Sequence, residues 1–145
     1  MAPGPCDTVE TTQTEIDRLK VQSKMLWGAL LMAHILFAGV ALSGITASDV
    51  APEVPFLIPV LAIFAMGSAA GSLFVWRLAR RPLAGFHAEP TAEQLRTVIP
   101  RYVVSWALTE SIAALALVVT LLGHAYATWA AFAVPAFLLM LVQRP

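Results

Sequence analysis

The chain has 145 residues, of which 59% are hydrophobic and only 12% are charged. This composition is far more apolar than that of soluble domains, so we expect the lipid bilayer to be its main partner. The formal net charge is zero, which gives no reason to expect nucleic-acid binding. Cys6 is the single cysteine, which excludes a disulfide within the chain and a multi-cysteine metal site.

Four predominantly apolar stretches dominate the sequence, at about 25–45, 55–76, 102–123 and 126–143. Each has close to the ~20 residues that an α-helix needs to cross ~30 Å of hydrocarbon. Because unpaired backbone groups are costly in lipid, we expect these stretches to be helices. The predicted fold is all-α: a polytopic membrane protein with four transmembrane helices in an antiparallel bundle. This bundle forms one domain over residues 12–145, behind a disordered N-terminal tail of residues 1–11.

The first apolar stretch follows a polar segment that carries a helix-start signal. Thr12 and Glu15 have the spacing of a capping box. We therefore expect a helix to begin near Thr12 and to run directly into the first span.

The second stretch contains Gly67 and Gly71 in a GxxxG pattern, within a run of small residues that continues to Ser72. Small side chains at this spacing allow another helix to approach closely. We expect these two glycines to be helix-packing residues. A partner helix in the same chain is favoured over a second copy, because three such helices are available.

The cytoplasmic elbow, residues 77–101, is the only sizeable polar connection. Thr91 and Gln94 form a second capping box, which predicts a short helix over 91–99 that Pro100 ends. An elbow of this length is too short for a catalytic domain. The very short connection between the third and fourth stretches makes those two helices antiparallel neighbours.

The nine Lys and Arg residues all fall on one side of this four-pass arrangement: Arg18, Lys20, Lys24, Arg77, Arg80, Arg81, Arg96, Arg101 and Arg144. The connections around 48–54 and 123–125 contain none. Under the positive-inside rule, both termini and the elbow are expected to be cytoplasmic, in the inner membrane of a bacterium. Six aromatic residues near the ends of the spans fit an interfacial belt: Trp27, Trp76, Tyr102, Trp106, Tyr126 and Trp129.

Glu110 lies inside the third apolar stretch. Inserting a charged carboxylate near the centre of a membrane helix costs roughly 2.5–3.5 kcal/mol. The apolar residues of this span offset that cost, so the helix can insert with Glu110 in it, but insertion gives no reason for the residue to be there. A carboxyl group removed from water can exchange a proton near neutral pH, which makes Glu110 a candidate proton- or cation-binding residue. The alternative is a hydrogen-bonded Glu that only holds helices together, and the sequence leaves both open.

His34 is expected at the same depth as Glu110. Counting from Lys24 and Arg101 at 1.5 Å per residue puts both side chains about 15 Å from the cytoplasmic ends of their helices. A single His in an apolar helix is usually a packing residue, and only the shared depth makes His34 a candidate relay partner for Glu110. No second intramembrane His and no metal-ligand spacing is present, so no metal or other cofactor is expected.

Three features of residues 55–123 resemble a known family. They are the small residues from Gly67 to Ser72, the loop sequence Ala79-Arg80-Arg81-Pro82, and the segment Ala107-Leu108-Thr109-Glu110-Ser111-Ile112. Together they resemble the hairpin of subunit c, the proteolipid of proton-translocating ATP synthases. The resemblance implies that Glu110 is the ion-binding carboxylate and that the loop faces the cytoplasm. The chain departs from that family in its single GxxxG, its longer loop and the added helix at each end.

These observations favour a non-enzymatic accessory or assembly subunit of a membrane complex, which binds other membrane subunits or itself. The alternative is a proton- or cation-handling protein that works through Glu110. The chain is small for a transporter acting alone, and it shows no inverted repeat. We expect no catalytic residues, because no nucleophile–base constellation is evident.

Overall fold

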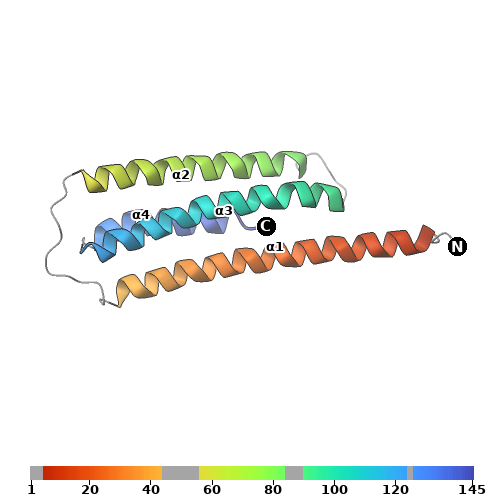
Figure 1. Cartoon of the computed structure of the whole chain (residues 1–145), viewed down its shortest axis with the longest axis horizontal. Helices are drawn as coiled ribbons and strands as arrows, with labels where there is room; N and C mark the ends of the chain where they lie inside the picture. The colour runs from red at the N-terminus through yellow and green to blue at the C-terminus, as the bar shows by residue number, and fades with distance from the viewer. Residues whose placement is uncertain (1–4, 44–55, 84–89, 124–125) are drawn as a thin grey trace.

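A computed structural model of the chain describes residues 5–43, 56–83, 90–123 and 126–145, with side chains from residue 13 onward. These residues form four α-helices, α1 (Pro5–Leu42), α2 (Leu57–Arg80), α3 (Ala92–Leu121) and α4 (Tyr126–Val142), and one 3-10 turn, η1 (Arg81–Leu83). Successive helices run in opposite directions, and α3 contacts each of the other three (Figure 1). The predicted all-α architecture of four helices is confirmed.

Three segments are long and apolar enough to cross a membrane: Gln13–Leu42, Leu57–Leu83 and Ala92–Leu121. Helix α4 is also apolar but has 17 residues, close to the lower end of the roughly 17–25 residues that spanning helices use. Large apolar side chains cover much of the outer surface, whereas a water-soluble bundle has polar residues there. Length, composition and surface together indicate a membrane protein.

Helix α1 begins earlier than the sequence predicts. Its first residue is Pro5, so residues 5–11 are helical and the predicted start near Thr12 is wrong. Proline is well tolerated in the first turn, because its missing N–H has no partner inside the helix there. Glu15, assigned to a capping box, forms an ion pair with Arg96 of α3.

The predicted capping box at Thr91 is confirmed. The Thr91 hydroxyl accepts a hydrogen bond from the Gln94 backbone N–H at 3.3 Å, and the Gln94 side chain accepts one from the Thr91 N–H at 3.0 Å. The helix that starts there does not end at Pro100, as predicted, but continues to Leu121.

Pro100 lies inside α3 because its neighbours are packed. Leu95 and Val98 on one side of it and Ser105 on the other are buried against the bundle. This packing offsets the roughly 3 kcal/mol that an internal proline costs. The predicted elbow therefore consists largely of the ends of α2 and α3, with residues 84–89 outside the described part of the chain.

The most deeply buried residues of α2 are not the two predicted glycines. Its buried residues are Ala65, Ser72 and Ala79, at the seven-residue spacing of left-handed helix packing. Gly67 is exposed, and a Cβ added there would meet no atom within 4 Å. A Cβ at Gly71 would meet only the Leu108 side chain, at 3.4 Å. Gly71 thus faces Leu108 of α3, whereas Gly67 takes no part in the contact between α2 and α3.

The antiparallel order brings the nine Lys and Arg residues to one end of the bundle. Three lie in α1, up to Lys24 near its middle, and three at the C-terminal end of α2 and in η1. Two lie in the first turns of α3, and Arg144 follows α4 (Figure 1). The basic end of the bundle, as we call it below, is thus a property of the fold as well as of the sequence.

Candidate functional site

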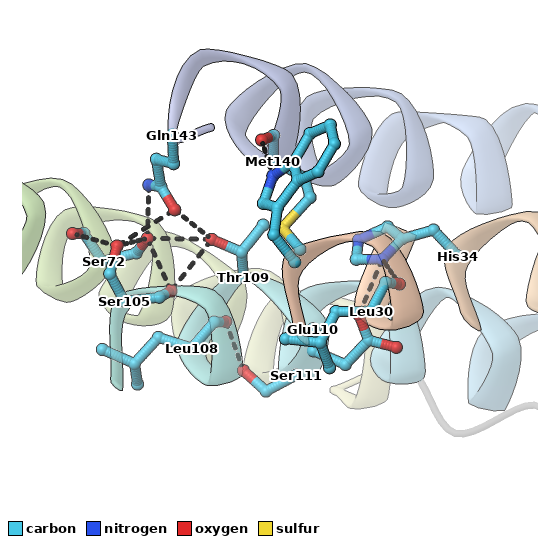
Figure 2. Close-up of polar contacts among 11 residues, drawn as sticks. Leu30, His34, Ser72, Ser105, Leu108, Thr109, Glu110, Ser111, Met140 and Gln143 are labelled. Carbon is cyan, nitrogen blue, oxygen red and sulfur yellow. Dashed lines mark hydrogen bonds and ion pairs between the residues drawn. The ribbon is translucent and has the colours of Figure 1, made fainter. Parts of the chain in front are cut away.

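Glu110 of α3 and His34 of α1 meet at the interface of their helices (Figure 2). The distance between His34 Nδ1 and Glu110 Oε2 is 2.6 Å. The same Nδ1 lies 3.2 Å from the carbonyl oxygen of Leu30, one turn earlier in α1. The structure thus brings together the two residues that the sequence assigns to one depth.

The polar atoms of this pair are covered even though Glu110 is not. The Glu110 side chain is 18% exposed, but both its oxygens are buried, so the methylene groups face outward and the carboxylate faces His34. By distance the contact is an ion pair when His34 is protonated. Among the described residues, Glu110 Oε1 and His34 Nε2 have no hydrogen-bond partner.

A second group of polar side chains lies on another side of α3. We call Ser72, Ser105, Thr109 and Gln143 the serine cluster; all four are 0% exposed. Thr109 and Glu110 are adjacent in α3, and the helical turn of about 100° per residue directs them to different neighbours. Figure 2 shows the serine cluster and the His34–Glu110 pair as two separate sites.

Hydrogen bonds in the serine cluster connect α2, α3 and α4. The Gln143 amide nitrogen donates to Ser72 Oγ at 2.6 Å, and Ser105 Oγ donates to Gln143 Oε1 at 3.0 Å. Ser72 Oγ and Thr109 Oγ1 are 2.8 Å apart. These side chains satisfy one another where no water is expected, as buried polar groups must. Such a cluster is suited to fixing helix register, and it has no free group for chemistry.

Two tryptophans donate hydrogen bonds to backbone carbonyl oxygens at the end of α4. Trp106 Nε1 donates to the Gln143 carbonyl oxygen and Trp27 Nε1 to the Met140 carbonyl oxygen, each at 3.0 Å. Trp106 is fully buried, so its predicted place in an interfacial belt is wrong. Its indole instead satisfies a carbonyl that the end of the helix leaves without an intrahelical partner.

Sequence reasoning missed Ser105 and Gln143 as site residues. Ser105 and Thr109 are four residues apart and so share one face of a helix, which was an available signal. The sequence contains no comparable signal for Gln143, because a polar residue just before Arg144 at the end of a span is expected to face water. The other two histidines of the sequence, His87 and His124, lie outside the described residues.

The site residues do not form a metal centre. Within the described segments, no group of three or more His, Cys, Asp or Glu residues is placed to hold a metal ion. No protein-family model, curated protein or solved structure matches the chain. The resemblance of residues 55–123 to subunit c thus has no support beyond its own residues.

Proposed function

We propose that this chain is a small integral membrane protein in which Glu110 and His34 form a proton-binding pair. The observation that carries the proposal is the 2.6 Å contact between two ionisable groups from different helices, in apolar surroundings. Ionisable residues inside membrane segments pair with one another and mark proton or ion pathways. The three long apolar helices support a place in the membrane.

The basic end of the bundle supports a proposed orientation of the protein in the membrane. Positive residues are retained on the cytoplasmic side of multi-pass proteins. All nine Lys and Arg residues lie at this end, so we propose that it and both termini face the cytoplasm.

The pair can hold one proton in two ways without acquiring net charge. The proton lies either on His34, as an ion pair with the Glu110 carboxylate, or on Glu110, beside a neutral imidazole. Both forms avoid the large cost of an uncompensated charge in a low-dielectric interior. When the pair loses that proton, one negative charge remains on it, and either another proton or a cation can neutralise this charge. The pair therefore has the chemistry of an exchange site.

Proton flux into liposomes tests this function. Purified protein is reconstituted with a pH-sensitive dye inside the vesicles, and acidification is followed after a proton gradient is imposed. We expect Glu110→Gln to abolish protein-dependent flux, because an amide cannot release a proton, and Glu110→Asp to retain part of it. Ser111→Ala, next in the chain, is the control and should keep wild-type flux.

Reactivity with a hydrophobic carbodiimide gives a second measure, since this reagent modifies protonated carboxyls in apolar surroundings. Glu110 should be modified in the wild type, and the label should be absent from Glu110→Gln. Flux in folded Glu110→Gln equal to that of the wild type would reduce the pair to a structural contact between α1 and α3.

An accessory role in a larger membrane assembly is the second candidate. It is favoured by the exposed position of Gly67, where open space surrounds the backbone, between exposed Phe64 and Phe74 on α2. A helix of another subunit or of a second copy could approach closely at this point. If so, Gly67→Leu should reduce the mass of the complex extracted in mild detergent and leave the fold of the chain unchanged. An unchanged mass would argue against this role.

A further inference from the structure

A pocket of about 260 Å³ lies between α1, α3 and α4, and the His34 side chain lines it. Three aromatic residues, Phe37, Trp129 and Phe137, form much of its wall. Ile35, Val134 and Leu138 also line the pocket and are exposed on the outer surface. The pocket is therefore open to molecules dissolved in the membrane.

His34 supplies a hydrogen-bond donor that the protein itself does not use. In the ion-paired form both ring nitrogens carry hydrogen, and Nδ1 faces Leu30 and Glu110. If the proton moves to Glu110 and is donated to Nδ1, Nε2 still carries its hydrogen. In these two states Nε2–H needs an acceptor, and among the described residues it has none.

The Nε2 edge of the imidazole is the edge without a hydrogen-bond partner among the described residues. The His34 side chain is 3% exposed, and its Nδ1 edge is occupied by Glu110 and Leu30. In Figure 2 the other nitrogen of the ring points away from Glu110, toward α4. Because Nε2 itself is covered, contact requires a small rotation of the ring about its Cβ–Cγ bond.

We infer that this pocket binds the ring of a membrane-dissolved quinone, with a quinone carbonyl oxygen accepting a hydrogen bond from His34 Nε2. A planar ring suits the aromatic wall, since stacked and edge-to-face ring contacts are favourable. One polar atom placed at the end of an otherwise apolar pocket is the usual means of orienting such a ligand. The volume is slightly below the roughly 300–1,000 Å³ of drug-sized sites, which fits one ring whose tail extends into lipid.

The inference rests on the proposed His34–Glu110 pair, but binding is measured without proton flux. A short-tailed benzoquinone is titrated into protein in detergent micelles, and quenching of tryptophan fluorescence reports saturable binding. An alkylbenzene with the same tail but no carbonyl oxygen is tested by its competition with the quinone. It should bind roughly tenfold more weakly, because it cannot accept the Nε2 hydrogen bond.

Two alanines on α4 give a matched pair of variants. Ala133 lines this pocket, and Ala133→Phe should abolish saturable quinone binding by filling it. Ala131 lies two residues away on an exposed face, where it lines a different groove, and Ala131→Phe should keep wild-type binding. Neither variant alters His34 or Glu110, so carbodiimide labelling of Glu110 should persist in both.

Each outcome bears on the inference. Absence of saturable quenching in the wild type, or equal binding by Ala133→Phe and Ala131→Phe, would overturn it. Equal affinity for the quinone and the alkylbenzene would mean that the pocket binds acyl chains and that a hydrogen bond from His34 Nε2 does not contribute to binding. Loss of labelling at Glu110 with quinone binding intact would instead refute the proton-binding proposal alone.

Discussion

The side-chain amide of Gln143, the residue that follows α4, donates a hydrogen bond to Ser72 Oγ of α2 over 2.6 Å. The two residues are 71 positions apart and both are fully buried. Through Ser105 and Thr109 the same amide also reaches α3. One side chain near the end of the chain thus fixes three helices relative to one another.

Gln143→Leu is expected to destabilise the bundle. It removes the hydrogen bonds that the Gln143 side chain makes with Ser72 and Ser105, and a buried hydrogen bond contributes about 0.5–1.5 kcal/mol to stability. Thermal unfolding in detergent, followed by circular dichroism, should show a lower Tm. The control is Val142→Ala, at an exposed neighbouring position, and it should change Tm little. Equal Tm values for the two variants would mean that the serine cluster contributes nothing to stability.

Larger side chains should change stability differently on the two small-residue faces of α2, the buried face of Ala65, Ser72 and Ala79 and the face that carries Gly67. Ala79→Leu inserts a large side chain at a fully buried position of α2, and overpacking costs about 1–3 kcal/mol. Gly67→Leu places the same side chain in open space, where substitutions usually change stability by about 0.5 kcal/mol or less. The comparison uses Tm of the monomeric protein in detergent. The reverse order would show that α2 packs through its GxxxG face after all.

A double-mutant cycle should reveal coupling between His34 and Glu110. Removing one partner, as in His34→Phe or Glu110→Leu, leaves the other buried and unpaired, which costs about 3–5 kcal/mol. The double variant should therefore be more stable than the sum of the single effects predicts. Denaturant unfolding in mixed micelles measures the free energy of unfolding for each protein. Strict additivity would indicate that the 2.6 Å contact has no energetic role.

The proposed orientation is checked by reporter fusions in the two long connections. A reporter that is active only outside the cytoplasm should be active when fused after residue 50 and inactive after residue 88. The reason is the one-sided distribution of Lys and Arg. Inactivity at both positions would contradict the four-pass arrangement.

The sequence by itself determined the helices and the levels of their residues. Apolar length identified the four helical segments, and the basic residues identified one end of the bundle. Because an α-helix rises 1.5 Å per residue, counting from Lys24 and Arg101 placed His34 and Glu110 at one level, and they meet there. Helix ends were less predictable, since packing carries α3 through Pro100.

Only the tertiary structure decided which face of each helix points inward. It placed Ser72 inside and Gly67 outside, buried Trp106, and gave Gln143 its partners. The physical reason is that lipid tails are as apolar as leucine, so a membrane helix needs no polar outer face. Hydrophobic periodicity, which reveals the buried side of a soluble helix, is therefore weak here. Rotation about each helix axis was set by contacts between side chains far apart in the sequence.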